Sequence, residues 1–151
     1  MIRQYIDIPP VWLIGALTLA WLQSTYVTLG LSLDWPIVQF IGGLCVGGGF
    51  LLIFLAAIEM WKHKTTIMPH QTANTLVTQG IFKRSRNPIY LGDTFILLGF
   101  ILTWDAVLSL SLVPAFVWII ERRYIEPEED RLRRKFRLEF ARYLQQTRRW
   151  M

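Results

Sequence analysis

The chain has 151 residues, the length of a single domain. Hydrophobic residues make up 53% of it and the mean hydropathy is +0.35, so the composition excludes an ordinary soluble domain of this size and indicates a membrane protein. A formal net charge of +5 would attract the chain to anionic lipid headgroups, and this attraction accounts for the excess of basic residues. We therefore expect a lipid bilayer rather than nucleic acid as the partner.

Four stretches of the chain carry almost no charge. They cover residues 8–33, 35–58, 87–104 and 106–120, with Asp93 as the one charged residue. A transmembrane helix needs about 20 apolar residues, so the first two stretches are long enough to span a bilayer and the last two are marginal. We expect the long side chains of Arg86, Arg122 and Arg123 to reach the headgroup region from the ends of the two marginal stretches, which lets these shorter stretches span the bilayer. Only residues 103–105 join the third and fourth stretches, so we predict a tight helical hairpin there.

The basic residues predict the topology. All sixteen Lys and Arg residues fall at Arg3, within 62–86 or within 122–149, and the turns near Asp34 and Asp105 contain none. By the positive-inside rule, both termini and the middle loop are cytoplasmic, and the chain crosses the membrane four times. The predicted fold class is therefore all-α: a multi-pass membrane bundle of four transmembrane helices with a C-terminal amphipathic helix in the cytoplasm.

We expect one integral membrane domain, residues 1–151. Its first two spans lie within 1–60, and spans three and four lie within 61–151 together with the polar motifs. The apolar run after Arg3 is longer than the core of a signal peptide, so it predicts a retained first helix. Cys45, the lone cysteine, cannot form an intramolecular disulfide or a metal cluster and is expected to be a packing residue.

Glycines gather in the second span, at positions 42, 43, 47, 48 and 49. A nucleotide-binding loop would need a strand before these glycines, and the sequence predicts none. We instead expect the Gly43-x-x-x-Gly47 pair to allow close packing of two helices in the membrane.

Residues 62–87 contain no long apolar run, so they are predicted to lie at the cytoplasmic surface. Pro88, at the first position of the third span, leaves nearby backbone N–H groups pointing outward. One interpretation is that these N–H groups bind an anionic group such as the carboxylate of a cofactor. The other is that they form only the ordinary first turn of the helix. Tyr90 and Asp93 follow within two turns, where Tyr90 either faces a pocket or anchors the membrane interface.

The C-terminal segment is also patterned. Pro127 is predicted to open a helix with an acidic first turn, 128–130. The apolar stripe of this helix consists of Leu132, Phe136, Phe140 and Tyr143. Glu128 lies one turn before the stripe and on its line, so we expect it to face inward. Glu129 lies off the stripe and is expected to be solvated, with Arg133 as its partner.

Three polar motifs occur in a specific order against these apolar segments. They are LVTQG at 76–80, RNPIYLG at 86–92 and EEDRL at 128–132. Together they resemble the isoprenylcysteine carboxyl methyltransferase and phospholipid methyltransferase family of integral membrane enzymes, whose pattern runs LVT-x-G, R-[HN]-P-x-Y-x-G and E-E-x-x-L. The resemblance covers about half of the chain.

This resemblance implies methyl transfer from S-adenosylmethionine in a pocket on the cytoplasmic side of the membrane. Carried over by position, the cofactor contacts are Asn74, Thr75, Leu76, Val77, Phe82, Asn87, Pro88, Tyr90 and Glu128. It implies that backbone groups at 75–77 hold the adenine and that Glu128 binds the amino group or the ribose hydroxyls. The ring of Phe82 or Tyr90 is expected near the sulfonium, which is a cation.

The sequence departs from the family pattern at four positions. Asn87 replaces a histidine, Arg137 stands where a glycine follows an aromatic residue, and Phe140 replaces the first of two tyrosines. Tyr124, with Arg123 adjacent, stands where the prenylcysteine enzymes place an arginine. These departures concern the acceptor substrate more than the cofactor.

The acceptor is expected to be lipophilic or delivered by the membrane. Methyl transfer is an in-line displacement that depends on positioning and on exclusion of water. A carboxylate or thiolate acceptor would be held by Arg123 or Arg86, whereas an amine acceptor needs a base, for which Glu129 and Asp93 are candidates. The two histidines have no metal-ligand companions in the sequence, so we expect no metal.

Two other functions stay open at this point. Sterol reductases share a comparable R-[HN]-x-x-Y-x-G-D turn, which residues 86–93 fit, so a nicotinamide-dependent membrane reductase is one alternative. The C-terminal cysteine and tryptophan pattern of those reductases is absent here. The other alternative is a non-enzymatic membrane module with the same fold.

Overall fold

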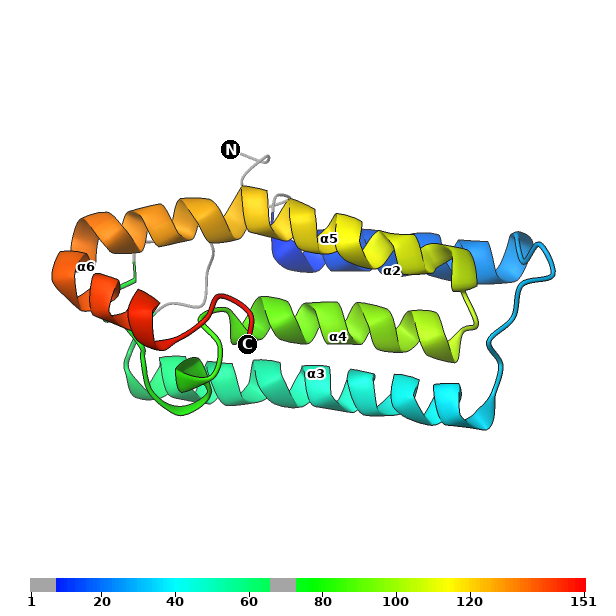
Figure 1. The fold of residues 1–151 in the computed structure, drawn as a ribbon, viewed down its shortest axis with the longest axis horizontal. Helices are drawn as coiled ribbons and strands as arrows, with labels where there is room; N and C mark the ends of the chain where they lie inside the picture. Colours follow the sequence, from blue (N-terminus) through cyan, green and yellow to red (C-terminus); the bar gives the residue numbers. More distant parts are fainter. Residues whose placement is uncertain (1–7, 66–72) are drawn as a thin grey trace.

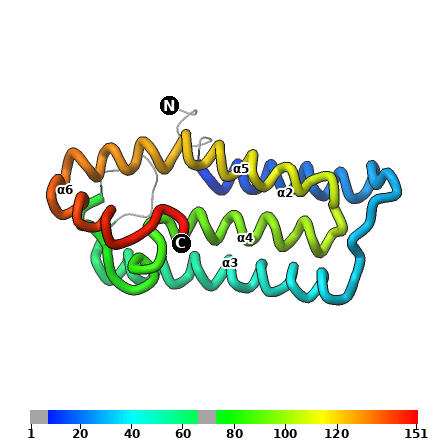
Figure 2. Tube along the Cα trace, viewed as in Figure 1, coloured from blue at the N-terminus to red at the C-terminus, as the bar shows by residue number. Residues whose placement is uncertain are grey.

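A computed structural model describes residues 8–65 and 73–151 (Figures 1 and 2). These residues form helices and turns, and no strand occurs among them. The helices are α2 (Pro9–Tyr26), α3 (Pro36–Lys62), η1 (Gly80–Lys83), α4 (Pro88–Thr103), η2 (Val107–Ser111), α5 (Leu112–Ile120), η3 (Glu121–Ile125) and α6 (Glu126–Gln146). The all-α prediction is confirmed for the described part of the chain.

Helices α2, α3, α4 and α5 alternate in direction and form an elongated bundle (Figures 1 and 2). The end of α3, the start of α4 and the end of α5 meet at one end of this bundle, beside α6. Basic residues flank the same end, because Lys62 closes α3, Arg86 precedes α4 and Arg122 follows α5. The polar motifs therefore lie at the basic end of the bundle.

Helices α3 and α4 approach each other through glycines. Gly42 faces Gly99, and Gly49 faces Gly92: a Cβ built on Gly49 would lie 2.6 Å from the carbonyl oxygen of Gly92. Open space surrounds the predicted packing pair Gly43-x-x-x-Gly47, so that prediction is wrong. Positions seven residues apart share one face of two nearly aligned helices, and the contact therefore uses this spacing instead of four.

Helix α3 has the length and composition of a membrane span. Its 27 residues make it the one helix of the described chain that is long and apolar enough to cross a bilayer. Its buried residues are Gly42, Gly49 and Ala56. Its exposed side chains include Phe40, Leu44, Phe50 and Phe54. A core helix of a soluble protein would bury such side chains, whereas a lipid-facing helix exposes them. The count of four crossings and the cytoplasmic termini stay predictions.

Helix α5 continues into α6 without a break. The backbone stays helical from Ile120 through the π-helical turn η3 to Ile125, which has φ −67° and ψ −52°. Pro127 has no N–H to donate to the carbonyl of residue 123, and the wide π-turn lies at this place. The prediction that Pro127 opens a helix is confirmed in that α6 begins at Glu126 with Pro127 in its first turn, but this helix continues α5 through η3 rather than starting after a break. The acidic residues that follow it do not lie at the free N-terminus of a helix.

Helix α6 bends sharply at Arg137, where φ is 39° and ψ is −107°. After the bend, the chain turns back toward the start of α4 (Figure 1). The predicted stripe packs into one apolar cluster from both sides of the bend: Leu132, Phe136, Phe140 and Tyr143. The stripe is confirmed, but it lies on a bent helix rather than a straight one.

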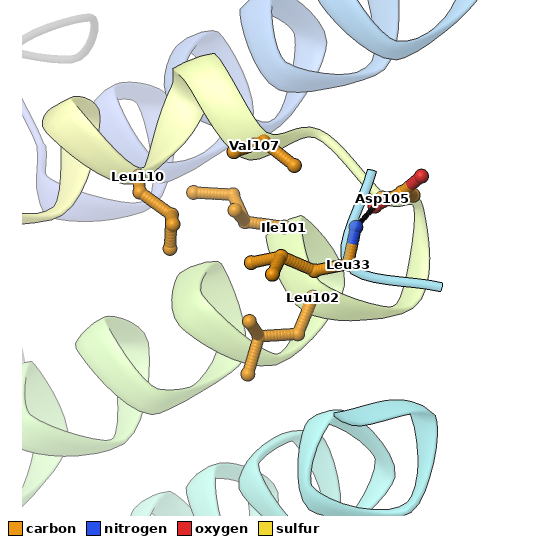
Figure 3. Close-up of a pocket in the computed structure, with 6 residues that line it drawn as sticks. All are labelled: Leu33, Ile101, Leu102, Asp105, Val107 and Leu110. Carbon is orange, nitrogen blue, oxygen red and sulfur yellow. Dashed lines mark hydrogen bonds between the residues drawn. The ribbon is translucent and has the colours of Figure 1, made fainter. Parts of the chain in front are cut away.

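The opposite end of the bundle is closed by its own side chains. The Asp105 carboxylate accepts hydrogen bonds from the backbone N–H of Leu33 at 2.6 Å and from the Ser32 hydroxyl at 2.5 Å. Figure 3 shows the apolar pocket beside them, which leaves no room for a bound molecule. Its lining residues are Leu33, Ile101, Leu102, Asp105, Val107 and Leu110. The predicted tight turn at 103–105 is confirmed.

Candidate functional site

The start of α4 contacts α6 through two of the predicted cofactor residues. The hydroxyl of Tyr90 donates a hydrogen bond to Oε2 of Glu128 at 3.2 Å. Tyr90 is buried, and its ring centroid lies 6.4 Å from that of Tyr124 on η3. Glu128 therefore faces the bundle, as predicted. The fold places a carboxylate beside two aromatic rings at the basic end.

Glu129 is the centre of a buried ion-pair network. Its carboxylate accepts hydrogen bonds from Nη2 of Arg86 at 3.0 Å, and from Nε and Nη2 of Arg149 at 3.2 and 2.8 Å. Arg149 also donates to Glu121 on the π-turn. The prediction that Glu129 is solvated and pairs with Arg133 is wrong, because the bend of α6 brings Arg149 back to it.

The network changes the ionisation of Glu129. Burial raises the pKa of its carboxyl, but the hydrogen bonds from Arg149 and Arg86 and their positive charges outweigh burial and leave the pKa below its ordinary value. The side chains of Glu129 and Arg86 are 10% and 11% exposed, so little water competes for these bonds. Glu129 and Arg86, both predicted to act on the acceptor, thus bind each other.

The C-terminal segment holds the turn before α4. The backbone N–H of Arg86 donates to the carbonyl of Arg148 at 3.0 Å, and its Nη1 donates to the carbonyl of Thr147 at 2.5 Å. The side-chain amide of Asn87 donates to the carbonyl of Arg149 at 3.0 Å. Residues 147–149 therefore fix the position of the motif turn, and Pro88, also predicted to contact the cofactor, lies buried beside it.

The segment with the LVT motif packs under α6. Leu76, Val77 and Phe82 are buried in the apolar cluster that holds the α6 stripe. The hydroxyl of Tyr143 donates a hydrogen bond to the Phe82 carbonyl at 2.7 Å. Three predicted cofactor residues therefore lie together, in a cluster distinct from the one that contains Tyr90.

The remaining predicted residues lie at the surface. Asn74 and Thr75 are exposed, and the Thr75 hydroxyl donates to the carbonyl of His63 at 2.9 Å. Arg123 is also exposed, with its guanidinium 5.4 Å from the ring centroid of Trp12 on α2. The structure thus brings Arg86 and Glu129 into contact and places Arg123 against α2. Their predicted chemical roles stay predictions.

A surface pocket of about 410 Å³ opens between the end of α3 and η1. It is lined by Leu55, Ile58, Glu59, Lys62, Gly80, Ile81 and Arg84, none of which was predicted as a site residue. In the described ranges, no group of three His, Cys, Asp or Glu residues could hold a metal ion. His70 lies outside the described residues.

Sequence reasoning missed Arg149, Thr147 and Glu121. Arg149 lies in a basic C-terminal run, which is typical of a solvated end. No periodicity places it near Glu129, because the two meet only after the bend at Arg137. The one available signal was the pair of adjacent acids in a segment that has many cations.

Comparison with protein families finds a match to the phospholipid methyltransferase family over residues 37–138, more than half of the chain. Comparisons with curated proteins and with solved structures give no match. The matched range contains the LVT segment, the motif turn before α4 and both glutamates of α6. It favours a methyltransferase over a reductase. The chain belongs to the phospholipid methyltransferase family, whose members are membrane-associated methyltransferases.

Proposed function

We propose that the protein is an integral membrane, S-adenosylmethionine-dependent methyltransferase that acts on a lipid or another membrane-delivered acceptor. The observation that carries this proposal is the contact of Tyr90 with Glu128 at 3.2 Å. It joins two family motifs, 38 positions apart in the chain, at the basic end of the bundle.

The residues around this contact fit the proposed cofactor. S-adenosylmethionine carries two cationic groups and one carboxylate, and it supplies an electrophilic methyl group when bound. The Glu128 carboxylate and the rings of Tyr90 and Tyr124 suit cationic groups. One turn along α6, the Nε of Arg131 is buried without a hydrogen-bond partner, and this donor suits a carboxylate. Leu76 and Val77 lie in the other apolar cluster, under α6, and their side chains suit a purine ring.

The ion-pair network has a positioning role in this proposal. Glu129 is adjacent to Glu128, and Arg86 lies four residues before Tyr90. Their ion pair at 3.0 Å joins α6 to the turn before α4 and so fixes the relative position of Tyr90 and Glu128. Positioning of this kind supports methyl transfer, which gains most of its rate from orientation and from exclusion of water.

The proposed topology has four crossings, with both termini and the active site in the cytoplasm, in the plasma or inner membrane if the source is bacterial. The basic end of the bundle supports this orientation. Labelling with a membrane-impermeant maleimide tests it, in a Cys45→Ser background. We expect Asp34→Cys to react from outside intact cells and Lys64→Cys to react only after the membrane is opened. The reverse pattern would invert the topology.

Calorimetric titration of the detergent-purified protein with S-adenosylhomocysteine tests the cofactor pocket, with NADPH as the parallel ligand. Loss of the Glu128 carboxylate in Glu128→Ala should weaken binding by roughly 10-fold or more, since hydrogen bonds to charged groups contribute about 1.5–3 kcal/mol. Glu139→Ala, on the exposed side of α6, is the control and should bind as the wild type does. Binding of NADPH alone would refute the proposal in favour of a reductase.

A further inference from the structure

The surface pocket between the end of α3 and η1 is built from two short helical faces, which lie side by side (Figure 1). Its volume of about 410 Å³ is in the range of sites that hold small molecules. The α3 residues are spaced three, one and three apart, so they share one face of the helix. We call this site the α3–η1 pocket; it is lined by Leu55, Ile58, Glu59 and Lys62 of α3, and by Gly80, Ile81 and Arg84 of η1 and its cap.

The α3–η1 pocket runs from an apolar end to a charged end. Leu55 lies two turns before Lys62, which is about 10 Å along the helix axis. The side chains of Phe54 and Leu55 are exposed on the face of α3 that suits lipid, and Trp61, beside Lys62, is 80% exposed. Tryptophan is enriched where membrane meets water. The pocket therefore extends from the level of the lipid chains to the level of the headgroups.

Glu59 and Lys62 form the charged wall on α3. The Lys62 ammonium donates a hydrogen bond to Oε1 of Glu59 at 3.0 Å. The Glu59 side chain packs against Gly80, where an added Cβ would lie 2.6 Å from the Glu59 Cδ. The glycine thus leaves room for the carboxylate that holds Lys62 at the pocket. An ammonium has three donors, so Lys62 keeps donors for a ligand.

Arg84 supplies a second positive charge from the other wall. Its side chain is exposed, and no ion pair or hydrogen bond joins its guanidinium to any residue within 8–65 or 73–151. Arg86, two residues further on, is in contrast bound to Glu129. Among the lining residues, two cations face one acid, so the pocket has an excess of positive charge. The unused guanidinium fits a phosphate, which it can bind through two parallel hydrogen bonds.

We infer that the α3–η1 pocket binds an anionic phospholipid of the phosphatidylglycerol type. Arg84 and Lys62 hold its phosphodiester, and the Glu59 carboxylate accepts a hydrogen bond from a headgroup hydroxyl. One acyl chain follows the apolar end of the pocket onto the lipid-facing side of α3. A zwitterionic lipid gains less from the excess positive charge, because its headgroup has no net charge. The inference goes beyond the proposed function, since it requires a membrane but no methyl transfer.

Native mass spectrometry of the detergent-purified full chain tests this inference with phosphatidylglycerol and phosphatidylcholine of identical chains. The first phosphatidylglycerol should bind at least about 10-fold more tightly than phosphatidylcholine. Arg84→Gln removes a charged hydrogen-bond donor and should weaken phosphatidylglycerol binding roughly 10-fold, while phosphatidylcholine changes less than about 3-fold. Arg84→Lys keeps the charge and should lose less. Arg142→Gln removes an exposed cation from α6 and is the control, with both lipids bound as in the wild type.

Three results would overturn the inference. They are equal binding of the two lipids, equal loss of phosphatidylglycerol binding in Arg84→Gln and Arg142→Gln, and binding of glycerol phosphate as tight as that of the lipid. The last result would assign the pocket to a soluble phosphate compound, since the apolar wall would then contribute nothing.

A second measurement separates the lipid site from the cofactor site. Arg84→Gln should bind S-adenosylhomocysteine as the wild type does and should keep its Tm within about 2 °C, because Arg84 is exposed. Loss of S-adenosylhomocysteine binding in this folded variant would overturn the inference, since the pocket would then belong to the cofactor site. Absence of S-adenosylhomocysteine binding in the wild type, with phosphatidylglycerol bound through Arg84, would refute the proposed function and support the lipid site.

Discussion

Removing the charge of Glu129 should destabilise the fold strongly. Glu129→Gln keeps the volume of the side chain but leaves Arg86, 11% exposed, and Arg149, 31% exposed, without their carboxylate. Breaking a buried ion pair costs about 3–5 kcal/mol, and the partial solvation of Arg149 reduces this to about 2–4 kcal/mol. For a chain of this length, 1 kcal/mol corresponds to about 3 °C in Tm, so we expect Tm to fall by about 6–12 °C.

The same network predicts a pH dependence. The pKa of Glu129 is lower in the folded protein than in the unfolded chain, whose value is near 4.5. Its contribution to stability is therefore fully present above pH 4.5 and is lost as the pH falls through the folded pKa. The wild type should lose Tm more steeply than Glu129→Gln as the pH is lowered below 4.5.

Thermal unfolding of the detergent-purified protein, followed by intrinsic tryptophan fluorescence, measures both effects. Glu139→Gln removes an exposed acid from the same helix and should shift Tm by less than about 2 °C. A double-mutant cycle with Arg149→Gln isolates the pair, and the double variant should lose less stability than the sum of the single variants. Additive losses, or equal Tm values for Glu129→Gln and Glu139→Gln, would refute the reasoning.

Three further predictions each concern a single residue. Tyr90→Phe removes the hydrogen bond to Glu128 but keeps the buried ring, so calorimetry should show roughly 10-fold weaker binding of S-adenosylhomocysteine with Tm changed little. Gly49→Ala places a Cβ against the α4 backbone and should cost about 1–3 kcal/mol in thermal unfolding, whereas Gly43→Ala, in open space, should cost nothing measurable. Arg137→Gly relieves a left-handed φ and should raise Tm by about 3 °C or more, and an unchanged or lower Tm would show that no strain is stored there.

Hydropathy and charge alone predicted the architecture of the bundle. The four uncharged stretches contain α2, α3, α4 and α5, and the three residues at 103–105 form the expected tight turn. These features follow from local composition, since an apolar run of helical length has few alternatives. The placement of the polar motifs at one end follows from the same pattern, because antiparallel neighbours return the chain to that end.

Local rules failed where the tertiary structure replaced them. A proline preceded by cations and followed by acids is a typical helix start, yet Pro127 lies inside a continuous helix. The π-turn accommodates the missing N–H and thereby removes the dipole argument for the acids. Glu128 and Glu129 are explained instead by partners more than 15 residues away in sequence, Tyr90, Arg86 and Arg149. No periodicity within α6 contains that information.

The bend at Arg137 connects the family pattern to the site. Relatives carry glycine here according to the resemblance, and a φ of 39° is a backbone conformation that glycine adopts without strain. Arginine pays about 1–3 kcal/mol for the same conformation. The contacts that the bend allows are of comparable or greater size, because Arg149 reaches Glu129 and Tyr143 reaches the Phe82 carbonyl only after the chain has turned. The strain at Arg137 is therefore offset by the network at the site, and Arg137→Gly should restore part of the stability that Glu129→Gln removes.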